Sequence, residues 1–298
     1  MSRIAYVNGR YLPYAKAAVH AEDRGFQFAD AVYEVIAVNE GRLVDAEGHM
    51  ARLERSLDEL RILRPMSRAA LVMVLTETVL RNRIHTGSVY LQVSRGAARR
   101  EFPFPAGVRP TVVAIARPLD MAKSDANAAK GVAVITRPDI RWSRCDIKTV
   151  GLLPAALAKQ AAKEAGAYEA WLVDRDGFVT EGSSSNAWIL TADNVLVTRP
   201  ISNAILGGIT RNAVMELVRR EGLRFEERPF TVAEALAARE AFVTSTTSFV
   251  MPVTSVDGKP VGNGGPGVVA ARLRSIYEAH AASHGRGQPD WQAVFAAP

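Results

Sequence analysis

Strand and helix patterns are interspersed along these 298 residues without the regular strand–helix alternation of a parallel βαβ fold. Apolar runs predict strands at 88–94, 111–116, 132–136, 186–190 and 241–245. Apolar residues at helical spacing, with turn signals at their ends, predict helices at about 153–165, 210–221, 232–238 and 267–282. This mixture favours the α+β class over a doubly wound sheet.

The periodicity also suggests where the chain divides. Asn8-Gly9 between apolar residues predicts a tight hairpin near the N-terminus. Apolar periodicity is lost at 120–131, so we expect a linker there. The prediction is a smaller N-terminal α/β domain at 1–119, a larger C-terminal domain at 132–285, and a poorly packed tail at 286–298.

Composition narrows the function classes. Hydrophobic residues make up 48% and charged residues 23% of the chain, which is ordinary globular usage. We find neither a secretory signal nor an apolar run of about 18 residues, so no membrane partner is expected. The single cysteine, Cys145, suits a reducing compartment such as the cytoplasm. The net charge of +6 comes from scattered basic residues, which argues against nucleic-acid binding.

Several familiar chemical motifs are absent from the sequence. It contains no G-x-x-x-x-G-K-[ST] phosphate loop and no G-x-S-x-G nucleophile elbow. His280 and His284 have the spacing of two metal ligands on a helix, but their polar surroundings favour a solvated helix end. We therefore predict no metal site.

Four segments can carry chemistry together. Lys148 lies among apolar residues just ahead of a helix, where a desolvated lysine suits Schiff-base chemistry. Glu181 precedes a Gly/Ser turn at 182–185 between two predicted strands. Glycines at 207–208 come directly before a helix, whose first N–H groups favour a phosphate. Hydroxyl residues at 244–248 end a strand. Each segment alone also has an ordinary structural interpretation, and only their joint presence indicates a site.

In this order and spacing the segments resemble the fold-type IV pyridoxal-phosphate enzymes, a two-domain family that includes D-amino-acid and branched-chain aminotransferases. The D-amino-acid aminotransferases look closest. The matching blocks are EDRGFQFADAVYEVI at 22–36, HMARLERS at 49–56, DIKTVGLLPAALAKQ at 146–160, VTEGSSSNAWI at 179–189, ILGGITR at 205–211 and FVTSTTS at 242–248.

The resemblance implies a role for each matched residue. Lys148 would hold pyridoxal 5'-phosphate as a Schiff base and then shuttle a proton, and Glu181 would pair with the pyridine nitrogen. The phosphate would be bound by Arg52, the backbone N–H groups of Ile209 and Thr210, and the Thr246 hydroxyl. The remaining matched positions are Ser185 on the cofactor and Tyr33 and Thr247 on the substrate side.

The loop after the strand at 88–94 departs from the family pattern. D-amino-acid aminotransferases typically carry an Arg-x-His pair that traps the substrate carboxylate. Here Arg100 matches the arginine, whereas Phe102 stands at the histidine position and Glu101 adds a negative charge beside it. In addition, Ala37 replaces a basic residue common after the tyrosine strand. We therefore expect a D-amino-acid transaminase with relaxed specificity that extends to (R)-primary amines.

Three alternatives stay open at this point. A branched-chain L-amino-acid aminotransferase and an aminodeoxychorismate lyase share the fold and the lysine. A catalytically silent binder of pyridoxal phosphate is the interpretation from a different class. Family members are usually homodimers that borrow a loop from the neighbouring subunit, and residues 95–104, with apolar Phe102 and Phe104, are the candidate for that loop.

Overall fold

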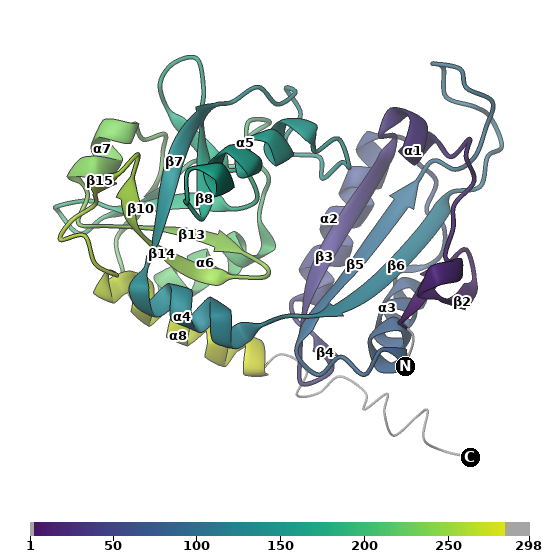
Figure 1. Cartoon of the computed structure of the whole chain (residues 1–298), viewed down its shortest axis with the longest axis horizontal. Coiled ribbons are helices and arrows are strands. Elements are labelled where there is room, and N and C mark those ends of the chain that lie inside the picture. Colours follow the sequence, from purple (N-terminus) through teal and green to yellow (C-terminus); the bar gives the residue numbers. More distant parts are fainter. Residues whose placement is uncertain (1–2, 284–298) are drawn as a thin grey trace. The chain divides into compact units, whose positions relative to one another are not determined.

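The computed structural model describes residues 3–283. The described chain divides into two compact units: residues 3–119, 147–151 and 281–283 form unit 1, and residues 120–146 and 152–280 form unit 2. Each unit has its own sheet and its own covering helices (Figure 1). This agrees with the α+β class.

Unit 1 is built on a six-stranded sheet in the order β2-β1-β6-β5-β3-β4, whose strand pairs are all antiparallel. Its strands are β1 (Ile4–Val7), β2 (Arg10–Pro13), β3 (Ala31–Asn39), β4 (Arg42–Leu43), β5 (Gly87–Ser94) and β6 (Thr111–Pro118). Its helices are η1 (Tyr14–Lys16), α1 (Arg24–Phe28), α2 (Ala46–Glu59) and α3 (Arg68–Arg81). The β1–β2 turn has positive φ at Asn8 and Gly9, which confirms the predicted hairpin.

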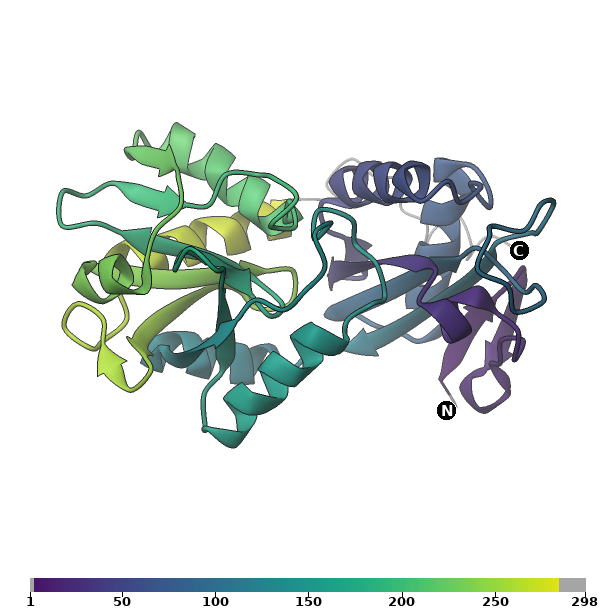
Figure 2. The ribbon, with the colours of Figure 1, turned by 90° about the horizontal axis from the view of Figure 1, so that it is seen from above.

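The core of unit 1 lies between one face of this sheet and the helices α2 and α3 (Figure 2). Alternate residues of β3 point into it, among them Val32, Ile36 and Val38. Leu53 and Leu57 of α2 meet them at helical spacing. The side chains at the other alternate positions point to the opposite face of the sheet, among them Tyr33 of β3 and Tyr90 of β5.

Unit 2 contains a nine-stranded sheet in the order β12-β11-β10-β13-β14-β7-β8-β9, with β15 beside β14. Its strands are β7 (Val132–Pro138), β8 (Glu169–Val173), β9 (Val179–Gly182), β10 (Asn186–Leu190), β11 (Leu196–Thr198), β12 (Phe225–Glu227), β13 (Glu240–Ser245), β14 (Phe249–Val256) and β15 (Lys259–Pro260). Its helices are α4 (Met121–Lys130), α5 (Leu153–Glu164), α6 (Ile209–Arg220), α7 (Val232–Ala237) and α8 (Val268–Ser283). The strand pairs β7–β14, β7–β8 and β11–β12 are parallel, so this sheet is mixed.

Residues 120–131, where the sequence suggested a linker, form helix α4 of unit 2. The Asp120 side chain accepts a hydrogen bond from Lys123 N at 2.9 Å and thereby caps the helix. Arg274 of α8 reaches Asp125 of α4 at 2.6 Å, so the two helices are joined by an ion pair. This helix buries only Ala128, so its sequence is polar and rich in alanine and shows little apolar periodicity. The helix was therefore not recognised from the sequence.

The expected tail at 286–298 lies outside the described residues. Within residues 3–283, no helix combines the length and the apolar character that crossing a membrane requires.

Candidate active site

Lys148 lies in the short segment 147–151, whose backbone is hydrogen-bonded to β3 of unit 1. Tyr33 N donates to Lys148 O at 3.0 Å, and Val150 N donates to Ala31 O at 3.1 Å. Ile147 is 3% exposed and packs into the core of unit 1, so the segment is anchored on both sides of the lysine. The Lys148 Nζ lies 4.2 Å from the ring centroid of Tyr33. The backbone therefore holds the predicted lysine and the predicted tyrosine together.

A second aromatic ring supports this pair. Tyr90 of β5 stacks on Tyr33 with 5.6 Å between ring centroids, and its hydroxyl donates to Gln92 Oε1 at 2.7 Å. Burial, together with the neighbouring Tyr33, raises the pKa of Tyr90 to about 12. Tyr90 consequently stays a neutral hydroxyl at physiological pH.

Arg52 of α2 faces a buried carboxylate on the helix side of the same sheet. Its Nε and Nη2 donate to the two oxygens of Glu34 at 2.8 and 2.7 Å. The His49 Nδ1 lies 2.7 Å from Glu34 Oε2, and the Glu34 side chain is fully buried. Because His49 and Arg52 are three residues apart on one helix, both reach the same carboxylate.

The charges in this cluster are set by burial and pairing. Burial by itself would raise the pKa of Glu34, but the Arg52 charge, its hydrogen bonds and the His49 contact outweigh it and lower the pKa to about 2. Burial lowers the pKa of His49, which fits a neutral imidazole that donates from Nδ1. Glu34 is therefore an ionised partner that fixes Arg52.

Glu181 is the last but one residue of β9 in unit 2 and is 5% exposed. Asn186 Nδ2 donates to one of its oxygens at 2.9 Å, and Leu206 N lies 3.2 Å from both. Arg141 also donates to this carboxylate. Burial nevertheless raises the pKa of Glu181 to about 7, because it exceeds the lowering by Arg141 and by Leu206 N. A second positive group next to Glu181 would stabilise its ionised form, which burial disfavours.

Arg141 serves two carboxylates at once. It donates through Nε and Nη2 to Asp139 at 2.9 and 2.7 Å, in addition to its bond to Glu181. Asp139 also accepts from the Thr180 hydroxyl at 2.7 Å. Burial is the main reason why the pKa of Glu181 is raised, and the negative charge of Asp139 beside it adds to the effect.

The start of α6 provides a second feature of unit 2. Gly208 is the N-cap residue and offers no side-chain cap, so the first-turn N–H groups of Ile209 and Thr210 are available to an anion. A Cβ at Gly208 would collide with the Asn186 side chain, so glycine is required for this close approach. Asn186 thus couples the helix start to Glu181.

The hydroxyl segment forms a turn between β13 and β14. Ser248 N donates to Ser245 Oγ at 3.2 Å, and the two serine hydroxyls are 2.5 Å apart. Arg274 of α8 donates to Ser248 O at 2.8 Å and fixes the end of the turn. In this turn Thr246 is partly exposed and Thr247 is exposed, so both side chains are accessible to a ligand.

Ser185 has a defined partner within unit 2. Its hydroxyl lies 3.1 Å from Glu169 Oε2, which also accepts from Ser184 at 2.8 Å, while Ser183 donates to the other oxygen. Glu169 is 1% exposed, so the three hydroxyls fix the turn after Glu181 on one buried anion. The cofactor contact of Ser185 stays a prediction.

The predicted substrate loop belongs to unit 1. Arg100 is exposed and its guanidinium lies 5.1 Å from the ring centroid of Phe28. Phe102 is 80% exposed and packs edge-on against the same ring at 5.6 Å. The structure thus brings the two predicted selectivity positions together on one aromatic residue.

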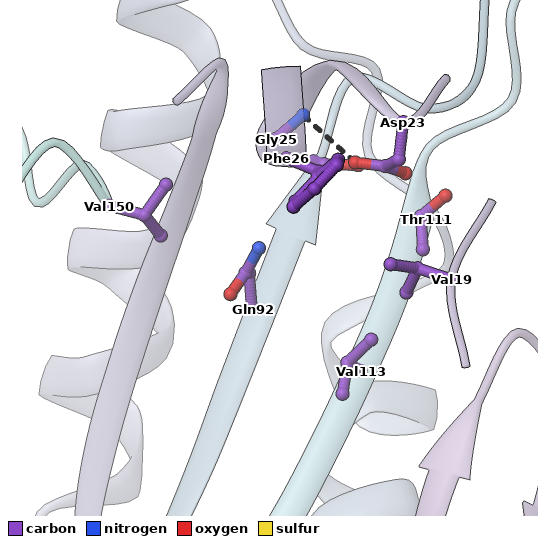
Figure 3. Close-up of a pocket in the computed structure, with 9 residues that line it drawn as sticks. Val19, Asp23, Gly25, Phe26, Gln92, Thr111, Val113 and Val150 are labelled. Atoms are coloured by element: carbon purple, nitrogen blue, oxygen red, sulfur yellow. Dashed lines mark hydrogen bonds between the residues drawn. The ribbon is translucent and has the colours of Figure 1, made fainter. Parts of the chain in front are cut away.

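A cavity of about 340 Å³ opens on the non-helical face of the unit 1 sheet (Figure 3). Among its polar lining residues, Asp23 is paired, since its carboxylate accepts from Gly25 N at 2.8 Å and from Ser94 Oγ at 2.9 Å. Phe26 and Val150 contribute apolar walls. None of the described residues predicted for the site lines this cavity.

Sequence reasoning missed the partners that hold the predicted residues. Glu34, His49, Asp139, Arg141 and Asn186 were not assigned. A signal existed for the first two, because Glu34 is a charged residue at a core-facing position of a strand and His49 shares a helix face with Arg52. The Asp139–Arg141 pairing with Glu181 depends on chain segments 40 residues apart and gave no local signal.

Residues 31–256 match the model of the amino-transferase class IV family. The chain belongs to that family. A D-alanine aminotransferase of Bacillus licheniformis is 44% identical over 271 residues, which cover 91% of this chain and 94% of the relative. A D-alanine aminotransferase of Staphylococcus aureus (strain COL) is 38% identical over 280 residues, 94% of this chain and 98% of the relative. These relatives confirm the predicted D-amino-acid branch of the family.

Solved structures agree on the fold. A branched-chain amino acid aminotransferase from T.th., complexed with N-(5'-phosphopyridoxyl)-L-glutamate, superposes with a TM-score of 0.86 at 27% identity, covering 98% of this chain and 97% of the other. The branched-chain enzyme of Escherichia coli gives a TM-score of 0.87 at 23% identity, with 98% of each chain covered, and supports the fold. The chain is a pyridoxal-phosphate-dependent aminotransferase of fold type IV.

Proposed function

We propose that the protein transfers the amino group of a D-amino acid of the D-alanine or D-glutamate type to a 2-oxo acid such as 2-oxoglutarate or pyruvate. The observation that carries this is the 44% identity over 91% of the chain to a D-alanine aminotransferase. The two branched-chain neighbours share less of the sequence, at 27% and 23% identity.

The described residues fit the cofactor of this family. The buried Glu181 carboxyl, with its pKa raised to about 7 although Arg141 contacts it, suits a protonated pyridine nitrogen as a second positive partner. The uncapped start of α6 suits a phosphate, and Thr246 would add a hydroxyl. Arg52, held by Glu34, would supply the charge-assisted contact. Lys148 would form the covalent link.

Each residue then has a task in the reaction. Bound pyridoxal phosphate supplies the electron sink that stabilises negative charge at the donor Cα. The Lys148 Nζ would move the proton to and from that carbon, and the backbone contact with Tyr33 fixes the segment that carries it. Glu181 would keep the ring nitrogen protonated, and Asn186 and Leu206 N hold its carboxylate in place. Tyr33 faces the substrate, and Tyr90 supports its ring.

Selection of the donor rests on the loop with Arg100. A single guanidinium there would bind the donor carboxylate, whereas Phe102 offers an apolar surface where the family pattern has a histidine. We infer relaxed specificity that extends to (R)-primary amines, because part of the substrate contact no longer depends on a carboxylate. Thr247 would complete the substrate side.

A spectroscopic experiment tests these statements. The purified holoenzyme is mixed separately with D-alanine, L-leucine and (R)-1-phenylethylamine, and the visible band of the lysine-bound cofactor is followed. We expect D-alanine to convert the band to that of the amino form. Reaction with L-leucine alone would favour the branched-chain alternative, and no reaction with any donor would favour a silent binder. A protein that shows no visible band after incubation with pyridoxal phosphate would refute the role of Lys148.

We further propose a cytoplasmic homodimer in which residues 95–104 reach the neighbouring subunit. Phe102 and Phe104 are 80% and 48% exposed, and a large apolar surface on a loop favours burial by a partner. The single Cys145 suits a reducing compartment. Light scattering after size exclusion should give twice the chain mass, and a monomeric mass would contradict the borrowed loop.

A further inference from the structure

The loop at 95–104 is held by an arginine that no prediction assigned. Arg24 of α1 is 3% exposed and donates through Nε to Asp30 at 2.7 Å. Its two terminal nitrogens reach the main-chain oxygens of Glu101 and Phe102 at 2.5 and 3.4 Å. A buried guanidinium has five donors in a fixed plane, so these contacts fix the loop backbone next to Arg100.

Phe28, at the other end of α1, holds the side chains of the same loop. The Arg24 guanidinium lies 4.6 Å from the centroid of its ring, and Arg100 lies 5.1 Å from that centroid. Phe102 packs edge-on against it at 5.6 Å. The Phe28 ring therefore contacts both Arg100 and Phe102, the two loop positions that correspond to the Arg-x-His pair of the family pattern.

The base of the loop is anchored by a second arginine on the same carboxylate. Arg95 donates to both oxygens of Asp30 at 2.6 and 3.0 Å, and to Leu60 O at 2.7 Å. Its guanidinium also lies 3.6 Å from the ring centroid of Phe104. The loop is thus fixed at its base by Arg95 and at its tip by Arg24, which leaves the Arg100 side chain to be placed by Phe28.

We propose that Arg24 and Phe28 are positioning residues for donor selection: together they hold Arg100 where it meets the carboxylate of the donor. This rests on the proposed function. The helix α1, rather than a histidine in the loop, then determines how strongly the enzyme favours amino acids over amines without a carboxylate. Phe28 acts only through Arg100, so its effect requires that arginine.

A double-mutant cycle on the holoenzyme tests this. Phe28→Leu should raise the KM for D-alanine about two- to fivefold, the range expected for loss of an exposed cation–π contact, with kcat little changed. The KM for (R)-1-phenylethylamine, which has no carboxylate, should stay the same. In the Arg100→Ala background, Phe28→Leu should have no further effect on the KM for D-alanine. Phe26→Leu is the matched control, because Phe26 lies on the same helix and is 76% exposed.

Limited proteolysis gives a readout that does not depend on activity. Trypsin cleaves after Arg99 and Arg100, which are exposed in the single chain. In the proposed homodimer the neighbouring subunit shields this loop, so cleavage reports release of the loop. Phe28→Leu and Arg24→Lys should speed this cleavage, since each loosens the loop, while Phe26→Leu should leave it unchanged.

The outcomes separate the two proposals. Wild-type enzyme that does not react with D-alanine would overturn the proposed function and this inference with it. If D-alanine reacts but Phe28→Leu raises its KM equally with and without Arg100, or raises the KM of the amine as much, only the positioning role is overturned. Unchanged tryptic cleavage in Phe28→Leu would also overturn it.

Discussion

Replacing Glu181 by glutamine should make the cofactor-free protein relatively more stable as the pH rises. Burial raises the pKa of Glu181 to about 7 from its ordinary value of 4.5, so the folded apoprotein binds this proton more tightly than the unfolded chain does. Stability therefore falls as the pH increases from 4.5 to 7, when the unfolded carboxyl ionises first. Glutamine has the size of the protonated carboxyl and does not titrate.

The magnitude follows from the shift. About 2.5 pKa units at 1.36 kcal/mol per unit give a cost of about 3 kcal/mol for the ionised carboxyl well above pH 7. Between pH 5 and pH 8, linkage predicts that the stability of Glu181→Gln relative to wild type grows by about 2 to 3 kcal/mol. In the holoenzyme the gain should be smaller, because the pyridine nitrogen provides the positive partner.

Urea unfolding of the apoprotein at pH 5 and pH 8 measures this difference. Trp171 and Trp188 are fully buried in unit 2 and report on the unit that contains Glu181. Glu216→Gln is the control, because that carboxylate is 61% exposed in the same unit. A difference between Glu181→Gln and wild type that does not change with pH, or that shrinks as the pH rises, would refute the reasoning.

Three further predictions concern other residues. The pKa of Glu34 is lowered to about 2, so its ionised form contributes roughly 3 kcal/mol to stability above pH 4.5, and this contribution is lost as the pH falls toward 2. Urea unfolding at pH 7 should therefore show Glu34→Gln less stable than wild type by about this amount, and the difference should narrow at pH 3. Partial burial raises the pKa of Cys145 to about 11, so iodoacetamide at pH 8 should alkylate it about a hundredfold more slowly than in the unfolded chain, and equal rates would contradict this raised pKa. Phe102→His should increase kcat/KM for D-alanine or D-glutamate, since an imidazole adds a donor beside the donor carboxylate, whereas Phe104→His should not; no gain would count against the loop as the carboxylate site.

Local sequence signals predicted the parts of the fold that local interactions decide. Asn8-Gly9 makes its turn because both residues accept positive φ, whatever the rest of the chain does. Helix α5 at Leu153–Glu164 and strand β5 at Gly87–Ser94 follow their apolar patterns within a residue or two. The family motifs identified the candidate lysine and Glu181 because their chemistry restricts the residue type.

Long-range packing decided what local signals could not. Residues 147–151 pair with β3 of unit 1 although they follow the first strand of unit 2, and no periodicity marks that return. The polar segment at 120–131 has a local cap, Asp120, but its contact with the rest of unit 2 is an ion pair between Asp125 and Arg274, 149 residues away in the sequence. Pairing of this kind depends on the finished fold.

The two buried carboxylates show how placement divides roles that sequence alone leaves equal. Glu34 has Arg52 in bidentate contact and a neutral His49 beside it, so it stays ionised and acts as a fixed counterion. The pKa of Glu181 is raised to about 7 by burial, which outweighs its contact with Arg141, and the nearby Asp139 adds a negative charge. The surroundings shift the pKa values of these two carboxyl groups in opposite directions. Glu34 is therefore a structural anion, whereas Glu181 suits a protonated ring nitrogen. At Glu34 the contacts with Arg52 and His49 outweigh burial, whereas at Glu181 burial outweighs Arg141 and Leu206 N, and only the folded chain determines this balance.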